Sequence, residues 1–404
     1  MGRLPYILPF LIALCLSQGV FSQNSKEAEL RARVRNEFHP ELKLERKLEL
    51  AEFYKENNIQ RADSMRSILI EESRYRSDSL RFKALFYNAE VALIRGDLEE
   101  YYQTIIACQP YLNVIDNKQV QFKVYRHLGY YHSSMQEYET AEFYYNQAVR
   151  VARRSKDYRA HSEALQYRAL NFANWNQKDT SLYYSQRAIQ YARRSGNRKE
   201  LARAFNTQAL IYDFLGQVEL SVAKNMISLY LAEEVKDIML QAKVSREIGQ
   251  SQILILNLDD AEYYFNRSLE HSRQIFDYRQ MALAMTNLAA VQLKRGQLDE
   301  AIENADRSIA YLTEAKDYNG LGETHNILGM VYKEQSRFNL ASSNFNQALV
   351  YYESTSNKEK IAGVYHNVGT VFKEQKKYNN ALNYLNRSVE IREQFGSRTQ
   401  IFLT

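Results

Sequence analysis

Small residues recur every forty positions along most of the chain, with large apolar residues between them. Counting from Gly129, the same place holds glycine or alanine in every later unit, and Ala89 holds it one step upstream. Two further small positions follow in each unit, starting from Ala141 and Ala148. Antiparallel helices approach closely only where neither carries bulk. The pattern therefore predicts one helix pair per forty-residue unit, packed through its small residues.

Large apolar residues occupy the positions that should fill the space between the two helices. Leu128 and Leu328 directly precede the small position of the first helix. Tyr145, Phe265 and Phe345 lie on the second helix, between its two small positions. We expect these side chains to form the core of each unit.

Polar residues mark the start of each predicted helix with the same period. One series of asparagine and aspartate residues precedes the first helices, where the side chains can accept the unpaired N–H groups as N-caps. A second series opens the second helices, where an acid or amide suits the positive end of the helix dipole. The first series is Asn117, Asp157, Asn197, Asp237, Asp277, Asp317 and Asn357, and the second is Glu139, Asp179, Glu219, Asp259, Asp299, Asn339 and Asn379.

The residue composition supports an all-helical protein. The 404 residues include 4 prolines and 14 glycines, and no proline follows Pro110. So few turn-forming residues argue against a β-sandwich or barrel, and 45% hydrophobic residues argue against disorder. The composition therefore favours long helices joined by short turns.

These residues resemble the tetratricopeptide repeat (TPR) family in a forty-residue form. The leucine, small residue and two later alanines of the family pattern match Leu128, Gly129, Ala141 and Ala148. The rival family at this period is HEAT, which the small-residue spacing disfavours. The resemblance implies an all-α fold, a right-handed superhelical solenoid of antiparallel helix pairs. The chain departs from the pattern in lacking the proline that commonly ends the second helix.

The two ends of the chain are expected to differ from the repeats. Residues 1–22 have a positive start at Arg3 and an apolar stretch from Leu4 to Leu16, which predicts a cleaved secretory signal peptide. Residues 23–78 are predicted to form N-terminal helices and a degenerate capping repeat, followed by an array of about eight repeats over 79–396. Residues 397–404 read as the start of an incomplete further helix.

Charge and cysteine content narrow the choice of partners. Without the leader, which carries only Arg3, the chain has 52 basic and 48 acidic residues, a net charge of +4. This weak balance and the predicted export disfavour nucleic acid as a partner. Cys108 is then the one remaining cysteine, so no intramolecular disulfide is expected. No later segment approaches the length of a membrane-spanning helix, so stable membrane insertion of the mature chain is not expected.

The sequence carries no pattern typical of an enzyme, a metal site or a cofactor site. None of the seven histidines forms the i, i+4 pair of a helical zinc site. His325 and His366 fall on adjacent first helices in repeat register, where an ordinary groove histidine is the favoured interpretation. There is no glycine-rich phosphate loop and no G-x-S-x-G motif. We therefore predict a non-catalytic protein without cofactor or metal.

The TPR resemblance implies that ligands bind in a groove lined by the first helices. Carried over position by position, the groove includes basic residues opposed by Glu163, Asp213 and Glu323, with amides that could hold a peptide backbone. The excess of basic residues is a modest bias toward an acidic or carboxylate-bearing ligand, although a solvated helix face with ordinary charge scatter is the favoured explanation of it. The candidate binding residues are Lys123, Arg126, Arg203, Asn206, Lys243, Arg246, Asn326, Lys333 and Lys373.

The function predicted from the sequence is that of an exported scaffold, periplasmic or secreted, that binds a protein or peptide segment. The alternative is a sensory input region of a bacterial signal-transduction regulator, a histidine kinase or a DNA-binding regulator, whose membrane and effector parts are not in this sequence. The sequence names neither the ligand nor the oligomeric state.

Overall fold

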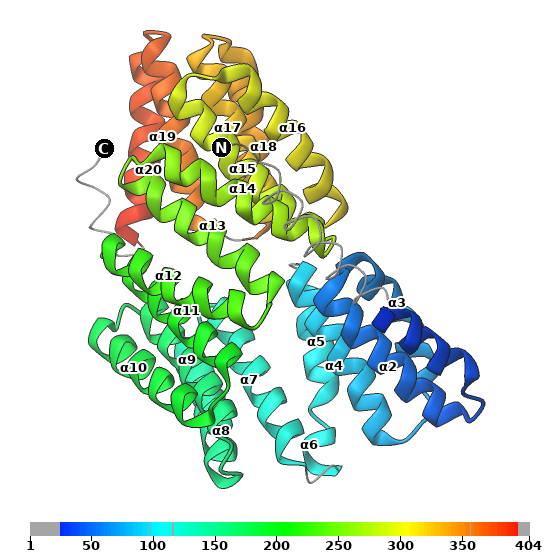
Figure 1. The fold of residues 1–404 in the computed structure, drawn as a ribbon. Coiled ribbons are helices and arrows are strands. Elements are labelled where there is room, and N and C mark those ends of the chain that lie inside the picture. Colours follow the sequence, from blue (N-terminus) through cyan, green and yellow to red (C-terminus); the bar gives the residue numbers. More distant parts are fainter. Residues whose placement is uncertain (1–24, 96, 115–116, 356, 395–404) are drawn as a thin grey trace, which may run out of the picture. The chain divides into compact units, whose positions relative to one another are not determined.

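The computed structural model describes residues 25–394 except 96, 115–116 and 356. The described residues form helices and no strand, which confirms the all-α prediction (Figure 1). They divide into two compact units, one within Met1–Leu93 and Glu99–Val120 and the other within Ile94–Leu98 and Gln121–Thr404. The predicted signal peptide and the predicted incomplete helix at 397–404 lie outside the described residues.

The first unit is a small helical assembly with its own core. Residues 25–36 are helical, and the further helices are α2 (Pro40–Asn57), α3 (Ile59–Ser73), α4 (Asp78–Arg95), α5 (Leu98–Cys108) and α6 (Tyr111–Val114). Leu44, Leu69 and Tyr87 are among the side chains buried in its core. The Tyr87 hydroxyl donates to the carbonyl of Ala62 at 2.8 Å, which satisfies the one polar group of this buried ring.

The second unit, which we call the repeat unit, contains seven helix pairs that follow one another in chain order (Figure 1). In the six pairs that span residues 158–394 the two helices contact one another extensively, and each second helix contacts the first helix of the following pair. The period of forty residues is kept from the first pair to the last. The first helices are α7 (Lys118–Ser134), α9 (Tyr158–Asn174), α11 (Arg198–Phe214), α13 (Ile238–Leu254), α15 (Tyr278–Arg295), α17 (Tyr318–Glu334) and α19 (Lys358–Glu374). The second helices are α8 (Tyr138–Arg154), α10 (Lys178–Ser195), α12 (Val218–Glu234), α14 (Leu258–Gln274), α16 (Leu298–Glu314), α18 (Phe338–Ser354) and α20 (Tyr378–Gln394).

Where the small position of a first helix is glycine, a large side chain of its own second helix faces it. A Cβ atom at Gly129 would lie 2.6 Å from the ring of Tyr145, and one at Gly249 would lie 2.6 Å from the ring of Phe265. Where the first helix carries alanine instead, as at Ala289, the opposite residue is small, here Ala305. Glycine thus faces a large side chain and alanine faces a small one. This compensation keeps the packing between the two helices dense.

The series of N-cap residues before the first helices acts as the sequence predicted. The Asp157 side chain accepts from the backbone N–H of Ala160 at 2.9 Å, and Asp317 accepts from Gly320 at 3.0 Å. The other members of the series bond in the same way. Each cap satisfies an N–H group that has no partner within its helix.

Most helices of the repeat unit end without proline because a residue one or two positions past the end takes a left-handed conformation. Gly196, Gly216 and Gly296 have positive φ there, which glycine adopts without strain. Non-glycine residues hold the same conformation in most other turns, for example Leu256 at φ 59° and Phe276 at φ 55°. The left-handed residue redirects the chain and lets following N–H groups satisfy the last carbonyls of the helix.

Candidate binding surface

First helices of successive pairs contact one another directly along much of the repeat unit. Polar side-chain contacts also join each first helix from α7 to α19 to the next first helix. We call the surface formed by these seven helices the first-helix face. It is the surface on which the sequence places the candidate binding residues.

A ladder of side-chain hydrogen bonds connects consecutive helices of this face. Arg126 pairs with Glu163 between α7 and α9, and Thr207 donates to Gln166 between α11 and α9 at 3.1 Å. Further along the unit, Thr286 and Thr324 share a hydrogen bond of 2.7 Å, and Asn367 donates to Asn326 at 2.9 Å. Because these partners lie about one repeat apart in sequence, the ladder fixes the stacking of each pair on the next.

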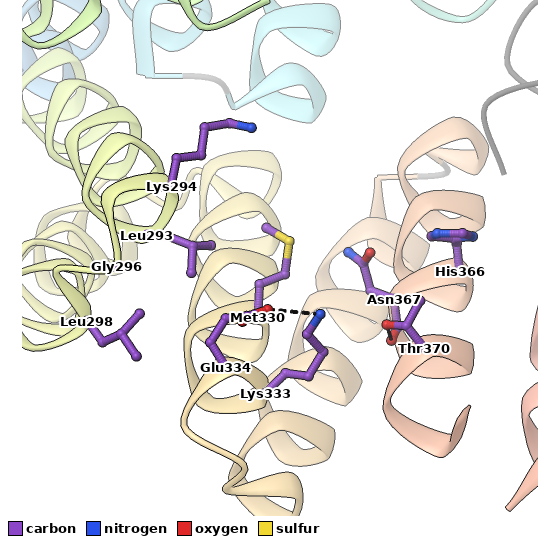
Figure 2. A pocket seen from close by; sticks show the side chains of 10 residues that line it. All are labelled: Leu293, Lys294, Gly296, Leu298, Met330, Lys333, Glu334, His366, Asn367 and Thr370. Atoms are coloured by element: carbon purple, nitrogen blue, oxygen red, sulfur yellow. Dashed lines mark hydrogen bonds and ion pairs between the residues drawn. The ribbon is translucent and has the colours of Figure 1, made fainter. Parts of the chain in front are cut away.

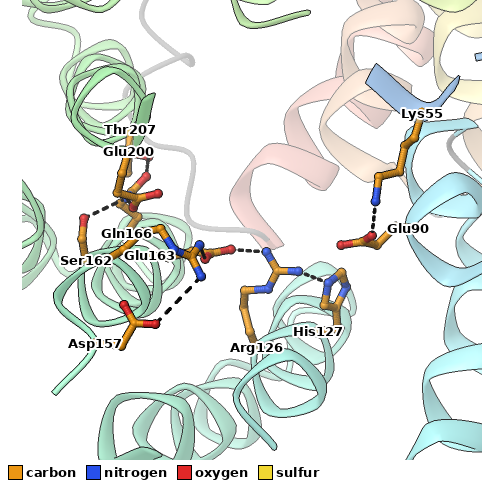
Figure 3. A network of polar contacts seen from close by, with 11 residues as sticks. Lys55, Glu90, Arg126, His127, Asp157, Ser162, Glu163, Gln166, Glu200 and Thr207 are labelled. Atoms are coloured by element: carbon orange, nitrogen blue, oxygen red, sulfur yellow. Dashed lines mark hydrogen bonds and ion pairs between the residues drawn. The ribbon is translucent and has the colours of Figure 1, made fainter. Parts of the chain in front are cut away.

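The ladder contains a buried acid near its beginning (Figure 3). Glu200 is 2% exposed, accepts a hydrogen bond from the Gln166 amide, and forms no ion pair among the described residues. Burial and the nearby Glu163 charge raise the pKa of Glu200 from 4.5 to about 7, against the opposing influence of Arg203 and Arg159. This carboxyl therefore changes its charge near neutral pH.

A second buried acid, Glu247, lies in the middle of the first-helix face and, unlike Glu200, has a cation close to it. Glu247 is 5% exposed, lies 3.6 Å from the Lys243 ammonium and accepts a hydrogen bond from Asn206. Lys243 also donates to Asn206 at 2.9 Å, and Asn206 reaches Asn225 on α12. The Asn206 amide is therefore fully used inside the protein and is not open to a peptide backbone.

Arg246 is the least compensated cation in the middle of the face. Its guanidinium makes two long hydrogen bonds, 3.4 Å to Gln280 and 3.3 Å to Gln250, and no ion pair within the described part of the chain. Burial lowers the pKa of Arg246, while nearby acids, Glu247 first among them, act in the opposite direction. The group stays charged, so a carboxylate brought to this position would gain a strong partner.

Two adjoining hollows open on the last three first helices. The larger, about 500 Å³, spans the end of α15, the start of α16, and α17 and α19 (Figure 2). The smaller, about 310 Å³, lies among α17, α18, α19 and α20. They share two lining residues, His366 and Asn367 of α19. The larger has the size of a site for a small molecule or a short peptide segment.

The structure separates the nine predicted binding residues into three groups. Those engaged in the ladder are Arg126, Asn206, Lys243, Arg246 and Asn326. Those that line a hollow are Asn326 and Lys333, the latter already paired with Glu334 at 3.0 Å and Glu374 at 3.5 Å. Lys123, Arg203 and Lys373 are exposed, and Arg203 is 4.0 Å from Asp237.

Most residues that line the hollows are not among the predicted binding residues, and three of them show why. Arg392 comes from a second helix, so a rule that considers first helices alone passes over it. Gly363 stands where other repeats carry a charged residue such as Glu323, and this absence of a side chain was a signal available in the sequence. His366 was recognised as a groove position and interpreted as an ordinary polar residue.

Sequence models of the tetratricopeptide repeat match two parts of the chain, residues 320–394 and residues 122–155. Together with the helix pairs at a constant forty residues, these matches decide the family. The chain is a tetratricopeptide repeat protein. No curated protein matches the sequence of this TPR protein.

Solved structures with the same fold include several regulators. A Rap protein complexed with competence and sporulation factor is 15% identical, with a TM-score of 0.61 over 92% of this chain and 99% of that chain. The apo quorum sensor NprR from B. thuringiensis is 14% identical, with a TM-score of 0.57 over 82% and 93%. A Rap conjugation gene regulator of plasmid pLS20, in complex with the Phr* peptide, is 12% identical, with a TM-score of 0.58 over 88% and 96%. At these low sequence identities, the similarity shows a shared fold alone.

Among the residues that the structure describes, no three His, Cys, Asp or Glu residues are grouped so that they could hold a metal ion. In the same residues, every helix is too short or too polar to cross a bilayer.

Proposed function

We propose that this TPR protein is an exported, non-catalytic scaffold that binds a peptide or a protein segment on its first-helix face. The observation that carries the proposal is the larger hollow, which three consecutive first helices line with both apolar and polar side chains. A site of this composition suits a peptide, whose side chains need apolar contacts and whose backbone needs hydrogen bonds.

The ligand class rests on charge and on the structural neighbours. Arg246 and Lys294 of the first-helix face, and Arg392 of the adjoining helix α20, have no ion pair among the described residues, so this region offers uncompensated positive charge. This charge favours an acidic or carboxylate-bearing segment. Two of the neighbours with the same fold were solved with a factor or peptide bound, which supports a peptide as the ligand.

The experiment is a comparison of two tryptophan variants on an array of random-sequence octapeptides. Thr370 lines the larger hollow, so Thr370→Trp should fill it and weaken peptide capture by at least about tenfold. Asn383 is exposed on the second helix α20, and Asn383→Trp is the matched control that should bind like the wild type. Equal binding by both variants, or no capture by the wild type, would overturn the proposal.

Export follows from residues 1–22 and has its own test. Fusing these residues to a reporter enzyme that folds only outside the cytoplasm should give activity, and an arginine in place of Leu11 should abolish it. Cleavage is expected near Ser22. An inactive wild-type fusion would contradict the predicted periplasmic or secreted location.

A second candidate function is the sensory region of a signal-transduction regulator. The neighbour described as a quorum sensor, NprR, favours it by fold. A reading frame that continues beyond Thr404 into a membrane helix or an effector domain would support this candidate over a free scaffold.

A further inference from the structure

The outer side of the second helix α12 is apolar, unlike that of its two neighbours α10 and α14. Leu220, Met226, Ile227 and Tyr230 lie along it and are between 40% and 60% exposed, and Ala223 is exposed among them. We call these five residues the α12 stripe. The positions equivalent to the four large ones hold Thr180, Gln186, Arg187 and Gln190 in α10, and Asp260, Asn266, Arg267 and Glu270 in α14.

The inner side of α12 is unusually polar. At the inward positions where α18 buries alanine and phenylalanine, α12 buries Ser221, Asn225 and Ser228. Asn225 accepts a hydrogen bond from Asn206 at 2.9 Å, and Ser228 donates one to the carbonyl of Ala202 at 2.8 Å. A surface helix of a water-soluble array normally has the opposite pattern, with its apolar residues inside and its polar residues outside. A contiguous apolar strip that remains exposed on such a helix is typical of an interaction surface.

Met226 lies near the middle of the stripe, beside the next second helix. The Tyr264 hydroxyl of α14 donates to the Met226 sulfur at 3.2 Å. Because the repeats follow one another at forty residues, Asn266 of α14 is at the level of Met226. Asp260 precedes this level by six residues and Arg273 follows it by seven. Both are exposed, and neither has an ion pair within the described part of the chain.

The helix of the preceding pair, α10, has the same arrangement of charge. Gln186 is its residue at the level of Met226. Asp179 precedes this level by seven residues and Arg193 follows it by seven, and both side chains are exposed. They too lack an ion pair among the residues that the structure describes. An acid and a base therefore stand about equally far on either side of one level, on both helices that flank the stripe.

This arrangement is complementary to itself under a two-fold rotation. If the axis crosses α12 near Met226 and the two α12 helices are antiparallel, each stripe covers the other. The same rotation brings Asp260 to Arg273 of the second copy and Asp179 to Arg193 of the second copy. Opposite charges on the flanks of an apolar centre are the pattern that favours one partner and one orientation.

We propose that two copies of this chain associate through the α12 stripe about a two-fold axis near Met226, with the two α12 helices antiparallel. Leu220 of one copy then packs near Tyr230 of the other, and the small Ala223 lets the two helices approach closely. The dimer goes beyond the proposed peptide binding, because α12 is a second helix and lies outside the first-helix face.

A parallel arrangement is disfavoured by the flanking charges. An axis that runs along α12 would place α10 of one copy on α14 of the other, with equivalent positions facing each other. Arg193 would then face Arg273, and Asp179 would face Asp260. Like charges at such short range repel, so the parallel dimer loses the contacts that the antiparallel dimer gains.

The acids of α12 itself do not oppose the antiparallel arrangement. Glu219 of one copy would approach the level of Glu233 of the other. Glu233 is already paired with Arg267 at 2.5 Å, so its charge is compensated within its own chain.

The first test is sedimentation velocity of the full chain at protein concentrations between about 1 and 100 μM, where the wild type should reach a dimer. Tyr230→Glu should weaken the dimer by at least about hundredfold, because the two-fold axis buries the new charge twice. Val350→Glu is the matched control. Val350 is exposed at the equivalent position three repeats later, on α18, and its substitution should leave the dimer unchanged. Both side chains are exposed, so the helix content measured by circular dichroism should stay that of the wild type.

The second test reverses the flanking charges. Asp260→Lys alone and Arg273→Glu alone should each weaken the dimer by about tenfold, because each variant places like charges together at both ends of the interface. An equimolar mixture of the two variants should form a mixed dimer of nearly wild-type affinity, since every Lys or Arg then meets a Glu or Asp. Carrying both reversals in one chain should restore the dimer in the same way.

Three results would overturn the proposal. The first is a wild type that remains monomeric at the highest concentration or forms open-ended species larger than a dimer. The second is a dimer that Tyr230→Glu and Val350→Glu affect equally. The third is a mixture of the charge-reversed variants that associates no better than either variant alone, which would exclude the antiparallel arrangement. Peptide capture on the first-helix face is measured separately and is not altered by any of these results.

Discussion

Gly329 and Phe345 lie so close that a Cβ atom on the glycine would be 2.5 Å from Cε1 of the ring. Phe345 is fully buried in its helix pair, so the ring can move only by displacing the side chains packed around it. Gly329→Ala should therefore destabilise the protein by about 1–3 kcal/mol, measured by urea unfolding.

The preceding repeat has alanine at both of these places, Ala289 and Ala305, so this fold accommodates two small residues there. The double variant Gly329→Ala with Phe345→Ala can therefore be compared with the two single variants. Phe345→Ala alone should cost about 3–5 kcal/mol because it leaves a cavity. In the double variant the new methyl group lies in that cavity, so its loss of stability should be smaller than the sum of the two single losses. Additive losses would show that the glycine and the ring do not share the space.

Glu200 predicts a dependence of stability on pH. Its pKa is raised from 4.5 to about 7 in the folded protein, so the folded state binds more protons than the unfolded state between these values. The contribution of this group to stability is complete below pH 4.5 and is lost as the pH rises to 7, by roughly 3 kcal/mol at most. Glu200→Gln should therefore raise the unfolding free energy at pH 8 relative to the wild type, and change it little at pH 5.

Glu247→Gln is the matched control for Glu200, because this second buried acid has the Lys243 cation at 3.6 Å. Removing its charge should leave Lys243 uncompensated and lower stability at pH 8. The idea that burial without a cation distinguishes Glu200 would be untenable if both substitutions shifted the unfolding free energy in the same direction.

Leu256 is expected to be a poor residue for its turn. Its φ of 59° is the left-handed conformation that Gly216 and Gly296 adopt at equivalent positions, and its side chain is 72% exposed, so little packing is lost on removal. Leu256→Gly should raise stability by up to about 1 kcal/mol, with part of the gain offset by the greater freedom of glycine in the unfolded chain. Calorimetry should show a higher Tm, and Gly296→Leu should show the opposite shift.

Cys108 should report the opening of the first unit. The thiol is fully buried at the end of α5, and burial raises its pKa to about 12, so almost none of the reactive thiolate is present at pH 8. In a Cys15→Ser variant, alkylation by iodoacetamide should be orders of magnitude slower in the folded protein than in urea. Similar rates in the two conditions would contradict the burial of this thiol.

The repeat architecture could be predicted because it depends on contacts that are local in sequence. Gly129 faces Tyr145 within one repeat, and Asp157 caps the helix that follows it, so a fixed spacing reveals both. The helix ends were harder to predict, because residues as unlike as Leu256 and Gly296 adopt the same left-handed turn. At these turns the fold imposes a left-handed backbone conformation even on residues that rarely adopt it, so residue type does not reveal the helix end.

The binding surface could be predicted only in outline, because each side chain's partner lies on a neighbouring repeat. Asn206 is at a position typical of ligand contact, but Glu247 and Lys243 of the next repeat occupy its amide. Arg392 reaches a hollow from a second helix, which no rule about first helices anticipates. Which polar groups remain free depends on how consecutive repeats meet, and position within one repeat does not carry that information.

The compensation between small and large residues within a single repeat bears on how such an array can change in evolution. Because Gly249 is matched by Phe265 and Ala289 by Ala305, both members of each pair are inherited together when one forty-residue segment is duplicated or deleted. Recombination between repeats can thus lengthen or shorten the array without mixing incompatible halves of a core. Crossovers between the two helices of a pair would mix them, and selection should confine recombination breakpoints to the turns that separate one pair from the next.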